Sequence, residues 1–192
     1  GNNEEARRSL INYLQTFPEG AFSSNANYYL GSIAFTKKEY DEALQRFKSV
    51  IDNGDTKFLE ESVARTAEMQ YLTQDFASAL ETFKRLQVIA ENPENKQAAR
   101  LGIMRCALQT GQQEEAQLAA NELLKDPKLS PEVEAEARYI RAKAYIDHKQ
   151  PAKALEDLKV LSKDTRTVHG AEAKYLLAQY FYDAKDDKNA EK

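Results

Sequence analysis

The most informative segment of the sequence is Tyr40-Asp41-Glu42-Ala43-Leu44-Gln45-Arg46-Phe47, in which a small alanine precedes a large aromatic residue by four positions. Residues four apart lie on one face of a helix, so Ala43 and Phe47 face the same neighbour. The apolar face continues through Val50 and Ile51. We therefore predict an amphipathic helix over residues 40–52, with Ala43 where a second helix approaches closely.

This pattern recurs along the chain at a nearly constant interval. Phe76-Ala77-Ser78-Ala79-Leu80-Glu81-Thr82-Phe83 is the clearest further copy. The alanine positions of all copies are Ala6, Ala43, Ala79, Ala116, Ala154 and Ala190, with spacings of 37, 36, 37, 38 and 36 residues. A repeat of this length predicts small helical units that bury their apolar faces by stacking.

Each interval also holds an earlier helical pattern, as in residues 26–35, where Ala26, Leu30 and Ile33 follow helical spacing. Ser130-Pro131 reads as an N-cap followed by proline at the first helical position. Pro93 is expected to stop the helix before it. The predicted helices cover residues 4–16, 24–36, 40–52, 57–72, 76–90, 95–109, 113–125, 131–147, 151–163, 168–183 and 187–192.

The composition agrees with a helical protein. Of 192 residues, 42% are hydrophobic and 30% charged, which excludes a disordered chain. Ala, Glu, Lys, Leu and Arg total 93, whereas Val and Ile total 13, which disfavours a large sheet. The longest apolar run is four residues, so we expect no transmembrane segment.

The net charge of −4 comes from acidic and basic residues that are interspersed. Nucleic-acid binding normally needs a concentrated basic surface to neutralise phosphates. We therefore expect no nucleic-acid partner.

On these residues the chain resembles the tetratricopeptide repeat (TPR) family. That family has Leu-Gly in its first helix, then an aromatic residue, an alanine and a second aromatic residue. Leu30-Gly31, Tyr40, Ala43 and Phe47 match this pattern. In later copies Gln113 and Pro151 stand in the first aromatic position, and Ala120 and Leu158 in the second.

The resemblance implies an all-α fold, a right-handed α-α superhelix (solenoid) of about five stacked helix-turn-helix units. A single solenoid would span residues 1–192, as a fragment of a longer protein. Its expected units are residues 1–20 (second helix only), 21–56, 57–93, 94–129, 130–166 and 167–192 (truncated).

A narrower resemblance concerns Phe17-Pro18-Glu19-Gly20, Asn25-Ala26-Asn27-Tyr28-Tyr29-Leu30-Gly31 and Tyr40-Asp41-Glu42-Ala43. These segments are similar to repeats of bacterial envelope proteins, namely the periplasmic Tol-Pal-associated cell-division coordinator and the outer-membrane assembly lipoprotein. This likeness implies a periplasmic or outer-membrane-associated location; a cytoplasmic one is the alternative.

Catalytic and metal-binding motifs are missing from the sequence. It has no Gly-rich phosphate loop, nucleophile elbow or zinc helix. Cys106 is interpreted as a packed thiol, and His148 and His169 as exposed loop histidines. We therefore expect no enzyme activity, catalytic residue, metal or cofactor.

In this family the first helix of each pair lines a concave groove, and this frame supplies the candidate site. The candidate partner-binding residues are Tyr28, Phe35, Glu68, Tyr71, Arg105, Tyr139, Lys143, Tyr175, Gln179 and Tyr182. The other groove positions are Asn25, Ser32, Glu61, Ala64, Leu101, Leu108, Glu136, Ile146 and Glu172. Six of the candidates are aromatic, and rigid rings with polar tips suit recognition. Burial of most of these rings between helices would contradict the idea.

Three functions remain open at this point. The first is a non-catalytic scaffold that binds a peptide or partner helix in the groove, in bacterial envelope assembly. The second is a structural spacer or oligomerisation module, with self-association through truncated ends. The third is an enzyme or small-ligand receptor, which no convergent polar cluster supports.

Overall fold

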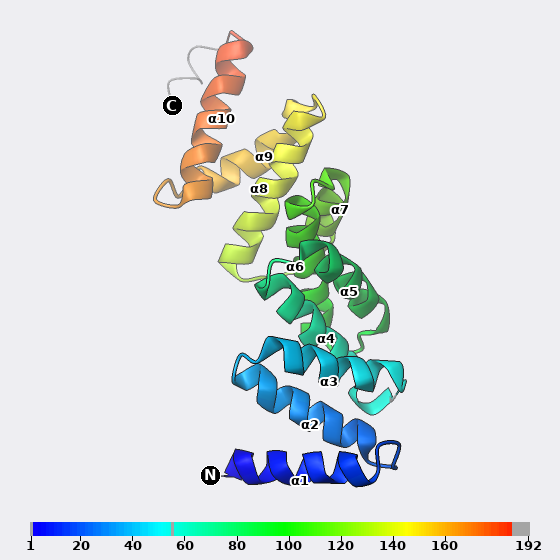
Figure 1. Ribbon diagram of the computed structural model, residues 1–192. Coiled ribbons are helices and arrows are strands. Elements are labelled where there is room, and N and C mark those ends of the chain that lie inside the picture. The colour runs from blue at the N-terminus through cyan, green and yellow to red at the C-terminus, as the bar shows by residue number, and fades with distance from the viewer. Residues whose placement is uncertain (1, 55, 186–192) are drawn as a thin grey trace. The chain divides into compact units, whose positions relative to one another are not determined.

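In the computed structural model, the described residues 2–54 and 56–185 form ten α-helices and no strand. The helices are α1 (Asn2–Thr16), α2 (Ser23–Thr36), α3 (Tyr40–Asp52), α4 (Thr56–Leu72), α5 (Phe76–Ile89), α6 (Pro93–Gln109), α7 (Gln113–Leu123), α8 (Pro131–Asp147), α9 (Pro151–Leu161) and α10 (Val168–Asp183) (Figure 1). The all-α prediction is confirmed for this part of the chain. The helix predicted over residues 187–192 lies outside it.

Most predicted boundaries are within two residues of the observed ones. Helix α6 starts two residues earlier than predicted, because Pro93 fits the first helical turn, where no backbone N–H is needed. The side-chain oxygen of Asn92 accepts the Glu94 N–H at 2.8 Å there. Pro93 therefore opens α6 as well as following α5.

Two helices end earlier than predicted, α7 at Leu123 and α9 at Leu161. After both ends the chain forms a backbone hydrogen bond between residues three apart, as in a 3₁₀ turn. Lys125 N–H donates to Glu122 C=O, and Lys163 N–H donates to Val160 C=O. Such tightening satisfies terminal carbonyls but stops the α-helical ladder.

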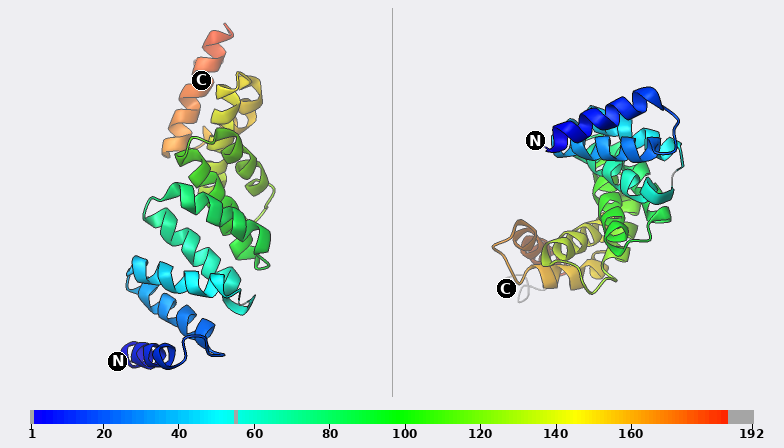
Figure 2. Two further views of the ribbon diagram at one scale, coloured as in Figure 1. Left: turned by 45° about the vertical axis from the view of Figure 1, so that its right-hand side comes forward. Right: turned by 90° about the horizontal axis from the view of Figure 1, so that it is seen from below.

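The chain divides into two compact units, residues 1–102 and 103–192, and the division falls within α6. The prediction of one five-unit array over the whole chain stays a prediction. In the first unit α1, α2, α3 and α4 pack in chain order, and α4 packs on α5. In the second unit α7, α8, α9 and α10 do the same. The views in Figure 2 show the neighbours α1, α2 and α3 side by side.

The alanine of each well-matched copy lies in the core. Ala43, Ala79, Ala116 and Ala154 are completely buried, whereas Ala6 on α1 is exposed. Helices α2 and α3 also approach closely at Gly31, where an added Cβ would lie 3.0 Å from the Phe47 ring. Small residues thus set the helix spacing, as the sequence predicts.

The turn that follows the first helix of each pair contains one residue whose backbone is in the left-handed region. The residues concerned are Lys38, Gln74, Gly111, Lys149 and Lys185, with φ between 56° and 75°. Their spacings of 36, 37, 38 and 36 residues equal those of the repeated alanines in the sequence, from Ala43 to Ala190, the last of which lies outside the described residues. The repeat therefore extends to backbone conformation, although glycine stands at one of the five places.

Candidate functional site

In the first unit, the candidate face lies on α2 and α4, which contact each other. The Tyr28 ring stacks on Phe58 with a centroid distance of 4.4 Å. Burial, followed by the nearby Glu61 carboxylate, raises the pKa of Tyr28. Tyr28 is therefore a half-buried, neutral ring that helps to join the two helices.

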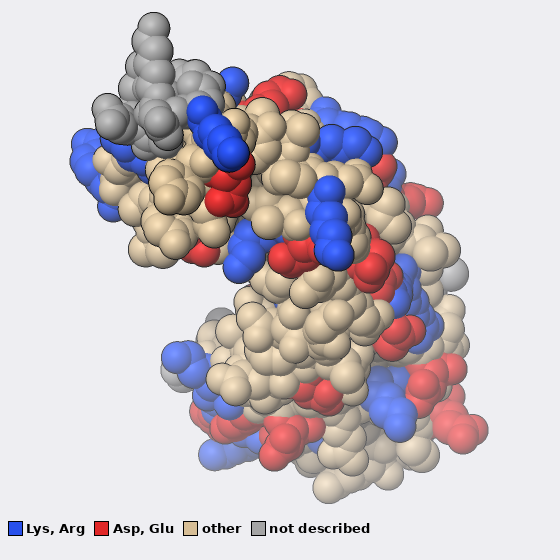
Figure 3. Space-filling model, turned by 90° about the horizontal axis from the view of Figure 1, so that it is seen from above, with Lys and Arg blue, Asp and Glu red and all other residues tan. Residues whose placement is uncertain are grey.

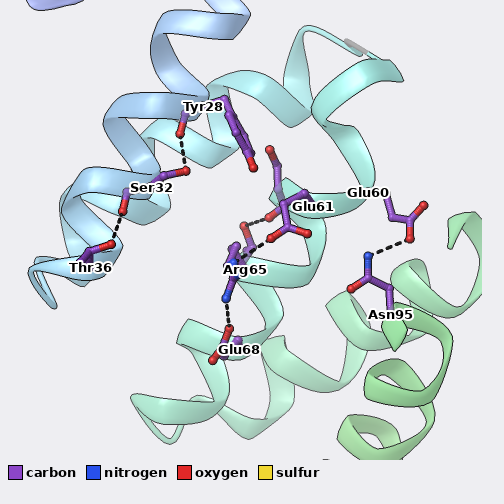
Figure 4. Close-up of polar contacts among 10 residues, drawn as sticks. Tyr28, Ser32, Thr36, Glu60, Glu61, Arg65, Glu68 and Asn95 are labelled. Atoms are coloured by element: carbon purple, nitrogen blue, oxygen red, sulfur yellow. Dashed lines mark hydrogen bonds and ion pairs between the residues drawn. The ribbon is translucent and has the colours of Figure 1, made fainter. Parts of the chain in front are cut away.

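Arg65 is the centre of a charged group on α4. Its Nε lies 2.9 Å from Glu61 Oε1, and its Nη1 lies 3.0 Å from Glu68 Oε2 (Figure 4). The guanidinium also sits 5.1 Å from the Phe35 ring centroid. Burial opposes the charged form, but Glu61 and Glu68 outweigh it and raise the pKa of Arg65. The candidates Glu68 and Phe35 thus already have a cationic neighbour.

The Tyr71 ring completes the candidates of the first unit. It meets the Phe76 ring edge to face at 5.5 Å, which connects the end of α4 with the start of α5. Both rings are half-buried.

In the second unit, Arg105 on α6 forms a two-point ion pair with Glu136 on α8. The distances are 2.9 Å from Nε to Oε1 and 2.7 Å from Nη2 to Oε2. Paired guanidinium–carboxylate geometry of this kind is among the stronger polar contacts in proteins. The pair holds α6 to α8, so Arg105 has a structural role beside its candidate role.

Tyr139 on α8 is the candidate ring of the second unit that packs against neighbouring side chains. It stacks on His169 at 4.7 Å, and the Lys143 ammonium lies 5.8 Å from its centroid. Burial first, and then a hydrogen bond to Glu172, raise the pKa of Tyr139. His169 was predicted to be an exposed loop histidine, which was wrong: it is the second residue of α10 and half-buried on this ring.

The candidates on α10 are the most accessible. Tyr175 is 66% exposed and Tyr182 is 72% exposed, and Gln179 between them is also exposed. Their spacing of four and three residues puts all three on one side of the helix. Of the six predicted groove rings, these two are exposed and the other four are half-buried; none is fully buried.

Two pockets open beside these candidates in the second unit. A pocket of about 190 Å³ is lined by Leu108, Gln113, Ala116, Tyr139, Ile140, Lys143, Ala144 and Asp147. A pocket of about 490 Å³ is lined by Ile146, Lys149, Pro151, Leu158, Leu176, Gln179, Tyr180, Asp183 and Ala184. The groove frame located Leu108, Tyr139, Lys143, Ile146 and Gln179 but missed Gln113, Pro151 and the two aspartates. At 113 and 151 the only sequence signal was the loss of an aromatic residue, and the aspartates gave none.

The other sequence-selected residues show ordinary structural roles. Cys106 is completely buried, and burial raises its pKa to about 11, as expected for a packed thiol. His148 caps the end of α8, with Nε2 3.2 Å from a Glu114 oxygen. Within residues 2–54 and 56–185, no three His, Cys, Asp or Glu side chains gather as a metal site requires.

Two further observations concern membrane-spanning helices and the distribution of charge. None of the described helices combines the length and apolarity needed to cross a bilayer. Figure 3 shows Lys and Arg side chains interspersed with Asp and Glu on the face in view.

Comparison with family models supports a tetratricopeptide repeat in the first part of the chain. Residues 1–57 match a family model described as tetratricopeptide repeat. A crystal structure of a tetratricopeptide repeat protein from Parabacteroides merdae is similar, with 16% sequence identity and a TM-score of 0.41. That alignment covers 99% of this chain and 83% of the other. No curated protein matches the chain.

Proposed function

We propose that this chain is a non-catalytic protein-binding scaffold that takes a peptide or partner helix on the first helices of its second unit, α8 and α10. Tetratricopeptide repeats generally mediate protein–protein interaction, and residues 1–57 match that family. The single observation that carries the proposal is the row of Tyr175, Gln179 and Tyr182 on α10. Two large exposed rings two helical turns apart, with an amide between them, have the composition of a binding hot spot.

Neighbouring residues extend this row. Helix α8 contacts α10, and its Tyr139 and Lys143 lie next to the smaller pocket. Tyr139 is held in place by His169, so it presents a fixed ring edge at little entropic cost. A partner on α10 can therefore continue onto α8.

The test uses the double variant Tyr175→Ala/Tyr182→Ala, because both rings are exposed and their removal should leave the fold intact. Partners captured from a lysate of the source organism are identified by mass spectrometry, and affinities are then measured with purified partner. We expect the variant to bind at least tenfold more weakly than wild type. The matched control Leu118→Ala/Val160→Ala removes exposed apolar side chains from α7 and α9 and should bind normally.

Retention of the partner by the tyrosine variant, together with its loss in the control, would move the interface to the second helices. That outcome corresponds to the second candidate function, a spacer or oligomerisation module. It is favoured by exposed apolar residues on second helices, Val88 on α5, Leu118 on α7 and Val160 on α9. Sedimentation of wild type and Leu118→Lys would then show whether these residues join copies of the chain.

The proposed setting is the bacterial envelope, in the periplasm or at the outer membrane. Support comes from the likeness of residues 17–20, 25–31 and 40–43 to repeats of envelope proteins. Cell fractionation with an antibody against this chain tests the location; recovery in the cytoplasmic fraction would reject it.

A further inference from the structure

Two aromatic pairs fill the same corner of the repeat in the first unit. The Phe35 ring at the end of α2 lies 6.2 Å from the Tyr40 ring at the start of α3. The Tyr71 ring at the end of α4 lies 5.5 Å from the Phe76 ring at the start of α5. In each case one ring comes from the last turn of a first helix and the other from the first residue of its partner.

The equivalent corners of the second unit have no such pair. With the spacing of the core alanines, Phe35 and Tyr71 correspond to Leu108 and Ile146. By the same spacing, Tyr40 and Phe76 correspond to Gln113 and Pro151. Each ring of the first unit is thus replaced by an aliphatic residue, a glutamine or a proline.

The two pockets of the second unit lie at these corners. Leu108 and Gln113 line the smaller pocket, and Ile146 and Pro151 line the larger one. Four further positions of α8, at 140, 143, 144 and 147, reappear 36 residues later on α10 as 176, 179, 180 and 183. Ala116 and Tyr139 of the smaller pocket, and Lys149, Leu158 and Ala184 of the larger, have no such counterpart. The pockets therefore share six equivalent lining positions, and both lie at corners where the intramolecular ring is missing.

We propose that each pocket receives a tyrosine side chain from a segment of the partner protein, which takes the place that Tyr40 occupies in the first unit. The proposal rests on the proposed function for the existence of a partner, and it adds the partner's chemistry. A cavity of about 150 Å³ is known to hold benzene, so the 190 Å³ pocket has room for a phenol ring.

The charged residues at the pockets favour a tyrosine over a phenylalanine as the partner's side chain. They also favour a partner segment that carries both acidic and basic residues. Each lining contains one ammonium and one carboxylate, Lys143 and Asp147 in the smaller pocket and Lys149 and Asp183 in the larger. The Lys143 ammonium lies 5.8 Å from the centroid of the Tyr139 ring, and both residues line the smaller pocket. A phenol can donate a hydrogen bond to the carboxylate or accept one from the ammonium, and flanking charges of either sign find an opposite charge.

The pocket is tested directly with p-cresol, the side-chain analogue of tyrosine, added to the full ¹⁵N-labelled chain. We expect saturable NMR shifts at residues lining both pockets, with a Kd of about 1 mM for so small a ligand. Gln113→Phe places a ring in the smaller pocket, as the first unit does, and should weaken binding there at least tenfold. Pro151→Phe should do the same only in the larger pocket.

The control Leu118→Phe adds a ring to α7 at a residue that is 65% exposed, and should leave both sites unchanged. Circular dichroism confirms that each variant remains helical. Shifts that do not saturate, or that persist in both filled variants, would overturn the proposal.

Failure of the pocket is distinguishable from failure of the scaffold. Loss of partner binding in Tyr175→Ala/Tyr182→Ala together with full binding by Gln113→Phe/Pro151→Phe would keep the scaffold and reject the pockets. Saturable p-cresol binding together with unchanged partner binding by the tyrosine variant would support the pockets and reject the α10 row.

Discussion

Arg141 on α8 makes two hydrogen bonds to the buried carboxylate of Asp157 on α9. Its Nε lies 2.7 Å from Oδ2, and its Nη2 lies 2.7 Å from Oδ1. Arg138, one turn earlier, adds a third bond of 2.8 Å to Oδ1. A carboxylate that is almost fully buried is tolerated because these bonds replace its lost hydration.

Removal of this carboxylate should destabilise the second unit. We expect Asp157→Ala to lower the free energy of unfolding by about 3 kcal/mol, since two partly buried guanidinium groups lose their shared partner. Urea denaturation measures the effect. Glu156→Ala, at an exposed neighbouring position, is the control and should change stability by less than about 0.5 kcal/mol. Equal losses in both variants would show that the buried bridge contributes nothing.

Two glycines should differ in their response to alanine. A Cβ at Gly102 would lie 2.4 Å from the Phe83 ring, whereas one at Gly31 would lie 3.0 Å from the Phe47 ring. Alanine gains about 1 kcal/mol of helix propensity at both places, and overpacking costs about 1–3 kcal/mol. We expect Gly31→Ala to be nearly neutral and Gly102→Ala to destabilise by about 2 kcal/mol. Denaturation midpoints in the reverse order would contradict this.

The left-handed turn residues predict a pair of opposite effects. Lys149 has φ 56° and Gly111 has φ 75°, and a Cβ at Gly111 would meet nothing within 4 Å. Backbone strain alone therefore decides the outcome. We expect Lys149→Gly to raise the free energy of unfolding by about 1 kcal/mol and Gly111→Ala to lower it by a similar amount. Thermal unfolding checks both, and stabilisation by Gly111→Ala would refute the argument.

Cys106 should be unreactive in the native protein. Burial raises the pKa of its thiol to about 11, so little thiolate exists near pH 8 and the sulfur is inaccessible. We expect Ellman's reagent to label the chain only in denaturant. Because the pKa is higher in the folded state, this group favours folding below pH 9 and the benefit is lost as pH rises toward 11. Rapid labelling of the folded protein at pH 8 would be the contrary result.

The repeated alanines allowed the helix pairs to be predicted, because the pattern involves only residues that are close together in the sequence. Ala43, Ala79, Ala116 and Ala154 lie in the core, as their spacing predicts. Ser130 accepts the Val133 N–H as the N-cap of α8, as predicted. Both features depend on residues within one or two turns, which sequence patterns report directly.

The candidate site was less predictable, because its character depends on contacts between distant residues. Periodicity put Arg105 and Tyr139 on the first helices but did not reveal their partners Glu136 and His169, each about 30 residues away. The helical periodicity of apolar residues also did not predict that Asp157 is buried, because an aspartate on a helix is ordinarily expected to face solvent.

The paired helices and their period of 36 to 38 residues can be predicted from the amino-acid sequence, because small residues at helical spacing set how closely neighbouring helices pack. Which side chains remain available to a partner depends on tertiary contacts that the sequence pattern does not report. Phe35 and Arg65 contact each other, whereas Tyr175 and Tyr182 stay exposed and the corners at Gln113 and Pro151 stay open. A side chain stays accessible to a partner only where the neighbouring helix has no side chain that packs against it. The neighbouring helix comes from another stretch of the chain, so the local sequence pattern does not report this contact.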